Sequence, residues 1–106
     1  TKIGRVVHIQ CRLTVNDTGT LTGAQSALIG GLPFASSSTS NTSTPVHGTQ
    51  ASGFAITDGD SVNGIINPNV NYISMKLWGS ASGTAGMTIT QWDTDGSIHV
   101  AGTYRV

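Results

Sequence analysis

Charge is scarce in this chain of 106 residues. Glutamate is absent, and charged residues make up 9% of the sequence, against about 25% in an average soluble domain. The formal net charge is zero, so the basic footprint that nucleic-acid binding requires is missing, as is a polybasic patch for anionic lipid. We therefore expect neither nucleic acid nor membrane insertion. A surface so poor in charge favours a module held inside a larger assembly.

Long apolar runs, cysteine pairs and metal-ligand spacings are also absent. No run of about 18 or more apolar residues occurs, so no transmembrane helix is predicted. The opening residues, TKIGRVVH, lack an initiator methionine and the apolar segment of a signal peptide, so we expect a piece of a longer protein. The single cysteine, Cys11, cannot form an intrachain disulfide and alternates with apolar neighbours, as a small buried residue would. No metal or cofactor is expected, because no histidine stands at ligand spacing from another histidine or from the cysteine. The histidines are His8, His47 and His99.

The residues that could serve in catalysis are poorly placed for it. Residues 79–83 resemble a nucleophile elbow, but Ala81 stands where the serine should be and no helix pattern follows. A carboxylate pair for glycoside hydrolysis would need two turn aspartates brought together by the fold. Segments 58–60 and 93–96 resemble calcium loops without the distal glutamate, so turns are the better interpretation. All five aspartates lie in predicted turns: Asp17, Asp58, Asp60, Asp93 and Asp95. We expect no enzyme activity.

Apolar residues recur with a period of two, which is typical of half-buried β-strands. In residues 7–15 the odd positions are apolar and the even ones polar, and the pattern returns at 73–78, 87–92 and 98–101. Turns rich in Asn, Asp and Gly separate these runs. We predict one all-β domain over residues 1–106, with about seven or eight antiparallel strands. The long connections after Val15 and Phe34 favour a jelly-roll-like β-sandwich over a simple meander.

Residues 36–44 are all serine, threonine or asparagine. Strand-like sequence on both sides argues against a linker between domains. Loops this long are usually functional or disordered. Two interpretations stay open at this point: an ordered loop or irregular edge segment at one end of the sandwich, and a mobile loop with no specific role.

Three aromatic residues fall on the outward phase of their predicted strands. Exposed aromatic rings offer flat apolar faces to sugar rings, or anchor a protein interface. The alternative is a register slip at a bulge that buries the tryptophans at the end of the sandwich. The candidate ligand contacts are Trp78, Trp92, Tyr72, Asp93 and Asp95.

Three segments taken together resemble a known family. They are TKIGRVVHIQCRLTV, then GLPF with the polar tract after it, then ISMKLWGSASGT leading to ITQWDTDGSIHVAGTYRV. In this order they resemble the C-terminal domain of bacteriophage tail fibres and tailspikes, and the resemblance spans essentially the whole chain. In that family a strand with Gly-Arg-Val-Val opens the domain, GLPF marks its middle and Gly-Thr-Tyr-Arg closes it.

The resemblance implies a homotrimeric β-sandwich at the distal end of a fibre on the virion. It implies trimer stabilisation and non-catalytic binding of a host surface polysaccharide, such as lipopolysaccharide or capsule. The rest of the fibre or tailspike would be the other partner. Two alternatives stay open: a purely structural trimerisation cap, and a stand-alone lectin-like module of another lineage. Candidate trimer contacts are the outward side chains His8, Gln10 and Arg12. Within GLPF we expect Leu32 and Phe34 in the core, with Pro33 ending strand pairing.

Overall fold

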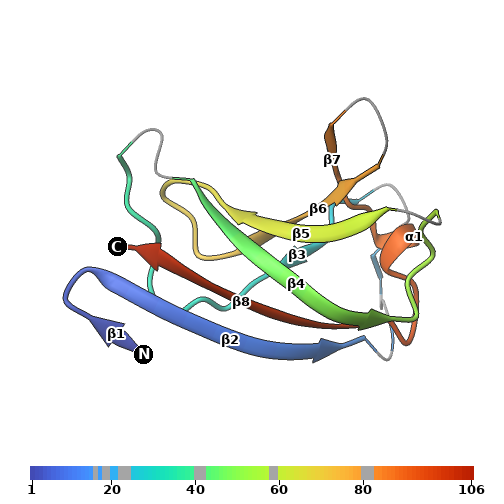
Figure 1. The fold of residues 1–106 in the computed structure, drawn as a ribbon, viewed down its shortest axis with the longest axis horizontal. Coiled ribbons are helices and arrows are strands. Elements are labelled where there is room, and N and C mark those ends of the chain that lie inside the picture. The colour runs from blue at the N-terminus through green and yellow to red at the C-terminus, as the bar shows by residue number, and fades with distance from the viewer. Residues whose placement is uncertain (16, 18–19, 22–24, 40–42, 58–59, 80–82) are drawn as a thin grey trace.

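Eight strands make up almost all the regular structure of the described residues (Figure 1). The computed structural model describes residues 1–15, 17, 20–21, 25–39, 43–57, 60–79 and 83–106. The elements are β1 (Lys2–Ile3), β2 (Val6–Thr14), β3 (Leu28–Ile29), β4 (Thr44–Ser52), β5 (Ser61–Ile66), β6 (Ile73–Trp78), β7 (Thr84–Gly86), α1 (Ile89–Trp92) and β8 (Ser97–Arg105). The prediction of an all-β fold with seven or eight strands is confirmed.

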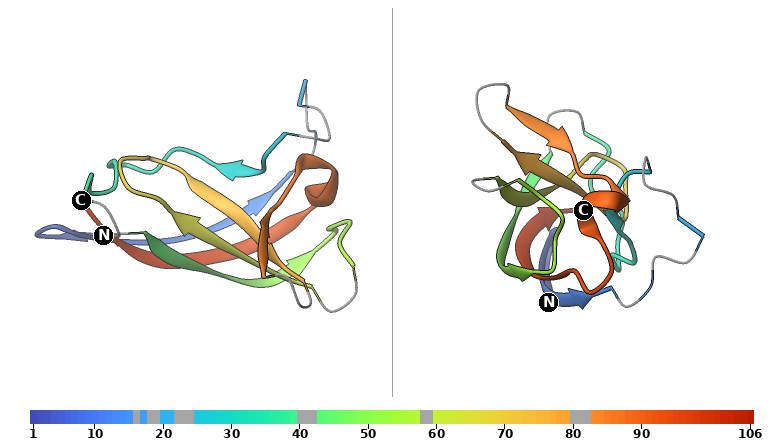
Figure 2. Two further views of the ribbon diagram at one scale, coloured as in Figure 1. Left: turned by 90° about the horizontal axis from the view of Figure 1, so that it is seen from above. Right: turned by 90° about the vertical axis from the view of Figure 1, so that its right-hand side faces the viewer.

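The strands form one antiparallel sheet in the order β1-β2-β8-β4-β5-β6-β3, and β7 pairs with β6. The longest pairing joins the two ends of the chain, from Val6 opposite Arg105 to Thr14 opposite Ser97. Figure 2 shows from above and from one end how the sheet curls around its interior. Hydrogen bonds connect all eight strands in a single sheet, and the finer assignment to a jelly-roll sandwich remains a prediction.

The core lies on the concave side of this sheet, and strand alternation fills it. In β6 the buried residues Ile73, Met75 and Leu77 alternate with more exposed ones, as predicted. Close packing also explains one strand glycine. A Cβ on Gly64 would lie 2.5 Å from Cγ2 of Ile73, so β5 can pass this close to the Ile73 side chain only because residue 64 has no side chain. The most completely buried side chains are Tyr104, Ile66, Ile73, Met75, Met87, Ile98, Val7, Val46 and Val100.

The predicted strand at residues 87–92 is wrong for its second half. Met87 is fully buried and Thr88 still forms a β-bridge with Ser26, but residues 89–92 form the short helix α1. The Gln91 side chain explains the change of structure, because its Oε1 accepts a hydrogen bond at 2.9 Å from the backbone N–H of Thr88. Within the described residues, no helix is both long and apolar enough to cross a lipid bilayer.

The described part of the polar tract is ordered. Ser36 is buried, donates its hydroxyl to the carbonyl of Asn67 and accepts the N–H of Val70 at 3.1 Å. The backbone N–H of Ser37 donates to the carbonyl of Arg105 at 2.8 Å. The tract therefore ties the turn before β6 to the end of β8, as the ordered-segment interpretation expected. Residues 40–42 lie outside the described residues, as do parts of the turns at 16–19 and 58–60 and of the elbow-like segment 79–83.

The GLPF motif differs from its prediction. Leu32 is half-buried against the core, as expected, but Phe34 is 43% exposed, so its predicted place in the core is wrong. The Phe34 ring lies instead beneath the ammonium of Lys2, 4.7 Å from the ring centre. The motif is anchored by its backbone, because the Tyr104 hydroxyl donates to the Phe34 carbonyl at 2.9 Å.

Candidate functional site

Trp78 is the exposed aromatic residue that the alternation of β6 predicts. It ends the strand with 58% of its surface exposed, on the face opposite the buried residues of β6. Its cross-strand neighbours are Ser61 on β5 and Thr84 on β7. The backbone of Trp78 is therefore held between β5 and β7.

A shallow hollow of about 200 Å³ lies beside this ring. Asn63 and Lys76 occupy directly opposite positions on β5 and β6, so their side chains share the outer face with Trp78. Asn63 is held toward β4 by its Oδ1, which accepts the N–H of Gly48 at 3.5 Å. The hollow is lined by Pro45, Asn63, Gly64, Ile65, Lys76, Trp78 and Thr84.

This lining combines an apolar ring with amide, hydroxyl and ammonium groups. A sugar has an apolar ring face and hydroxyl groups at its rim, and a flat aromatic face with a few fixed polar groups is complementary to it. Sequence reasoning found Trp78 but missed Asn63 and Lys76. The two are brought together only by the register of β5 and β6, which the sequence pattern does not reveal. No group of side chains suited to a metal ion occurs among the described residues.

The prediction that Trp92 points outward from a strand is wrong. Trp92 is 5% exposed, at the end of α1, and its indole N–H donates to the carbonyl of Gly96 at 3.2 Å. Its ring packs on Phe54 with the ring centres 4.9 Å apart. The alternative of a tryptophan buried near the end of the sheet is the one that the structure supports, and Trp92 offers no open ring face to a ligand.

The other three candidate contacts lie apart from Trp78. Tyr72 is half-buried and precedes β6, six residues from Trp78, which corresponds to roughly 20 Å along a strand. Asp93 and Asp95 are exposed in the turn after α1, with φ of 61° and 66°. This turn connects a helix to a strand rather than the two strands of the predicted hairpin. None of the three residues lines the hollow beside Trp78.

The predicted trimer contacts all lie on the convex face of β2. His8, Gln10 and Arg12 are exposed, and His8 Nδ1 is hydrogen-bonded to the hydroxyl of Thr103 on β8 at 2.8 Å. In the register of β2 and β8, Arg12 stands opposite His99. The face is therefore a paired sheet surface with polar side chains, and its use as a subunit contact remains a prediction.

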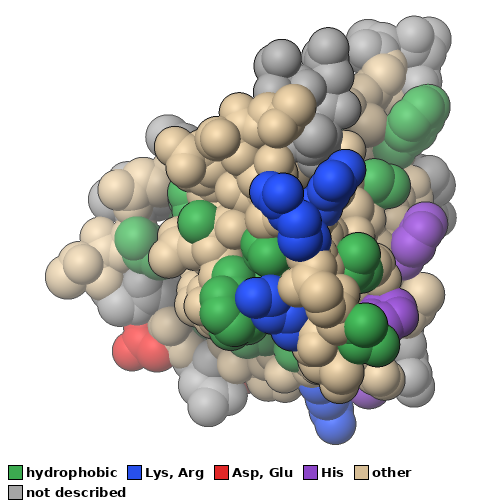
Figure 3. Space-filling model, turned by 90° about the vertical axis from the view of Figure 1, so that its left-hand side faces the viewer, with side chains coloured by type: hydrophobic (Ala, Val, Ile, Leu, Met, Phe, Trp, Pro, Cys, Tyr) green, Lys and Arg blue, Asp and Glu red, His purple; other side chains and the backbone are tan. Residues whose placement is uncertain are grey.

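The end of the molecule that holds both termini combines apolar and basic side chains. Ile3 is 74% exposed and Val6 is 44% exposed, on the hairpin of β1 and β2. Arg5 lies in the turn between them and its Nε donates to the carbonyl of Val106 at 3.0 Å. Figure 3 shows this end, where lysine and arginine side chains lie close to hydrophobic ones.

Comparisons of the chain with protein-family models, curated proteins and solved structures gave no match.

Proposed function

We propose that this chain is the distal, non-catalytic module of a bacteriophage tail fibre or tailspike, and that it binds a host surface polysaccharide through the hollow beside Trp78. The order of the three motifs in the sequence supports the assignment to the fibre. The single structural observation that carries the binding function is the exposed indole of Trp78 on a paired strand, with Asn63 and Lys76 beside it.

The lining of the hollow indicates the class of sugar. The indole face would stack on the apolar face of one sugar ring, and the Asn63 amide would hydrogen-bond to its hydroxyls. Among the described residues that line the hollow, Lys76 is the one charged side chain and no carboxylate occurs. We therefore propose that acidic polysaccharides, whose uronate or phosphate groups can pair with an ammonium, bind more tightly than neutral ones.

A calorimetric titration with purified lipopolysaccharide and capsular polysaccharides tests this function. We expect Trp78→Ala to weaken binding between about 5-fold and 150-fold, if stacking of the sugar ring contributes on the order of 1–3 kcal/mol, as stacking of a nucleobase on an aromatic side chain does. Phe34→Ala is the matched control, since Phe34 is also an exposed aromatic residue but lies outside the hollow. Equal losses in both variants, or no binding of any host polysaccharide by the unmodified chain, would contradict the proposal.

The threefold assembly is the second part of the proposal. We place the subunit contact on the convex face of β2, at His8, Gln10 and Arg12, where polar side chains stand on a regular paired surface. Sedimentation equilibrium should give three times the chain mass of 10.9 kDa, or a multiple of that value. Arg12→Glu should shift that mass downward, whereas Lys76→Glu, on the outer face of β6, should leave it unchanged.

A purely structural cap is the competing function, and the exposed Ile3 and Val6 favour it. Apolar side chains this exposed are commonly covered in an assembly. Replacing the domain by an unrelated trimerisation motif separates the two functions. Host adsorption that survives the replacement would favour the cap, and adsorption that is lost would favour glycan binding.

A further inference from the structure

Within the part of the chain that the structure describes, the outer edge of β2 has no strand partner over residues 9–13. On the other side β2 pairs with β8 along its whole length. On the outer side β1 pairs only with Val6 and Val7, and the last bonds are the two between His8 and Thr1, at 2.7 and 3.0 Å. Because His8 directs its N–H and C=O to this edge, Gln10 and Arg12 do the same. Within the described residues, no backbone hydrogen bond reaches these two from the outer side.

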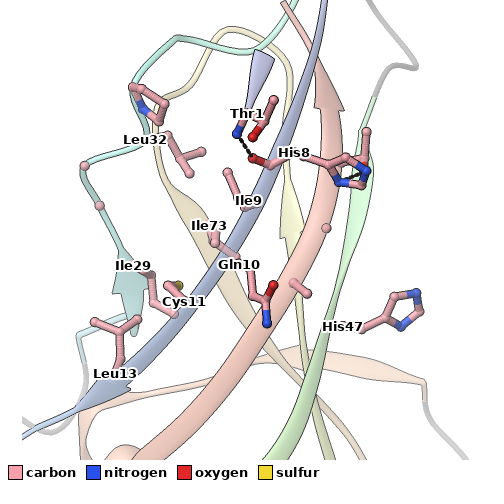
Figure 4. A pocket seen from close by; sticks show the side chains of 16 residues that line it. Thr1, His8, Ile9, Gln10, Cys11, Leu13, Ile29, Leu32, His47 and Ile73 are labelled. Carbon is pink, nitrogen blue, oxygen red and sulfur yellow. Dashed lines mark hydrogen bonds between the residues drawn. The ribbon is translucent and has the colours of Figure 1, made fainter. Parts of the chain in front are cut away.

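An apolar cleft runs along the same edge. It is part of a hollow of about 1060 Å³ whose lining also includes polar side chains of β2, β4 and β8, and its apolar part lies between β2 and the segment that begins with β3 (Figure 4). In this view Ile9, Cys11 and Leu13 point toward Ile29 and Leu32 across the gap, and all three β2 residues are only partly buried. The edge thus offers two things to a neighbour: backbone donors and acceptors, and an apolar surface on the concave side.

We infer that a second copy of this chain docks on this edge, with the two β2 strands antiparallel about a twofold axis at Cys11. In that register Ile9 of one copy faces Leu13 of the other, so the apolar cleft of each copy is covered by apolar side chains. Gln10 faces Arg12 of the second copy on the convex side. The contact is thus self-complementary, as a twofold interface must be.

The hydrogen-bonding phase of the strand agrees with this register. Gln10 and Arg12 direct their backbone groups outward, so the Gln10–Arg12 pairs are the hydrogen-bonded ones, with about two bonds each. Cys11 then falls in a non-hydrogen-bonded pair with its own copy, where Cα atoms approach to about 4.5 Å.

Neighbouring registers are less favourable. An axis at Arg12 would place two arginines opposite one another, which is destabilising. An axis at Gln10 would direct the second β2 onto position 8, which Thr1 already occupies. The unpaired stretch from Ile9 to Leu13 is centred on Cys11, and the axis at that residue uses all of it.

This contact does not depend on the proposed glycan binding. It uses the backbone edge of β2, whereas the threefold contact proposed above uses the convex face of the same strand, and both contacts include the side chains of Gln10 and Arg12. A chain that forms only the edge contact would sediment at twice 10.9 kDa, and one that forms both would reach six copies.

The single cysteine provides the test, because every crosslink in the chain must pass through position 11. Two Cys11 thiols would lose two hydrogens to the oxidant diamide and form a disulfide between copies. We expect a covalent dimer on a non-reducing gel, forming at least about 10-fold faster than in 8 M urea. Two shifted variants, Ile9→Cys and Leu13→Cys in a Cys11→Ser background, test the register. We expect them to crosslink with each other when mixed, and much more slowly when alone.

A backbone variant tests the edge itself. Gln10→Pro removes an outward N–H that no described residue uses, and proline is tolerated on edge strands. We expect it to abolish the Cys11 crosslink while Gln10→Ala retains it, with unchanged circular dichroism in both. Crosslinking no faster than in urea, or equal crosslinking of all positions, would overturn the proposal. So would a chain that stays monomeric and crosslinks only to an added extended peptide, because the edge would then belong to a strand of another protein.

Discussion

Removing the hydroxyl group of Ser36 should destabilise the fold more than any other serine truncation in the described part of the polar tract. Ser36 is 7% exposed, and its Oγ forms two hydrogen bonds, one to the carbonyl of Asn67 and one from the N–H of Val70. In Ser36→Ala both bonds are lost, while the backbone bond from Ser36 N–H to the Val70 carbonyl can persist. Each lost bond costs about 0.5–1.5 kcal/mol, and the partly buried N–H of Val70 would be left without a partner. We expect a loss of about 2–3 kcal/mol.

Urea unfolding at a fixed protein concentration measures this loss, with circular dichroism as the probe. The midpoint should fall without a change in the slope m, because the native surface is unchanged. For a domain of this size the loss corresponds to roughly 10–20 °C in Tm. Ser38→Ala is the control, since Ser38 is exposed two residues away, and its effect should stay within about 0.5 kcal/mol. Equal stabilities of the two variants would refute the assignment of a structural role to the Ser36 hydroxyl.

Three further predictions concern other parts of the sheet. In Trp78→Phe the remaining Trp92 is buried, so its fluorescence should be blue-shifted and only weakly quenched by acrylamide. In Trp92→Phe the remaining Trp78 is exposed, so its fluorescence should be red-shifted and strongly quenched. Similar quenching in the two variants would contradict this difference in burial. Gly64→Ala should cost about 1–3 kcal/mol through overpacking, whereas Gly86→Ala, with nothing within 4 Å of its Cβ, should not; equal urea midpoints would contradict this. Burial raises the pKa of the Cys11 thiol, so its alkylation rate should reach half-maximum at a higher pH in the folded chain than in the unfolded chain. The free energy of unfolding should correspondingly fall as the pH rises above the pKa of the unfolded thiol. A half-maximum at the same or a lower pH in the folded chain would refute this.

The period of two predicted β2, β6 and part of β8, but not β4, which has nine residues like β2. Burial against a curled sheet imposes that period directly, so Val7 to Val15 and Ile73 to Trp78 show it in the sequence. The short strands were not predictable in this way, because β3 has two residues and β7 has three, too few for alternation to appear. The order of the strands, with β2 beside β8, depends on pairings across almost the whole chain, which no local pattern contains.

The short helix had a sequence signal that alternation concealed. Met87 and Ile89 alternate with threonines, which indicated a strand. Thr88 and Gln91, however, have the spacing of a helix-capping pair, and in the structure the Gln91 side chain accepts the N–H of Thr88. Once the helix turns the chain, Trp92 packs onto Phe54 instead of pointing outward. The local capping signal therefore outweighed the alternation, and one of the three predicted aromatic contacts moved into the interior.

The candidate site depended on register in the same way. Trp78 could be found because its own strand fixes its face, but Asn63 and Lys76 are thirteen residues apart and become neighbours only when β5 pairs with β6. The face on which a side chain lies can thus be predicted from its own strand, whereas the polar groups beside it can be found only once the pairing of the strands is known.

The edge of β2 connects the composition of the chain to its assembly. Natural sheets usually protect an open edge with lysines, prolines or inward-pointing charges, which prevent pairing with another chain. Between Ile9 and Leu13 this edge has no proline and no inward charge, and Arg12 is its one charged residue, pointing outward. A sequence with so few charges elsewhere does not supply the missing protection. Exposed backbone groups at such an edge bond to water, but an apolar cleft beside them favours a covering neighbour, so the scarcity of charge and the open edge both favour contact with another chain.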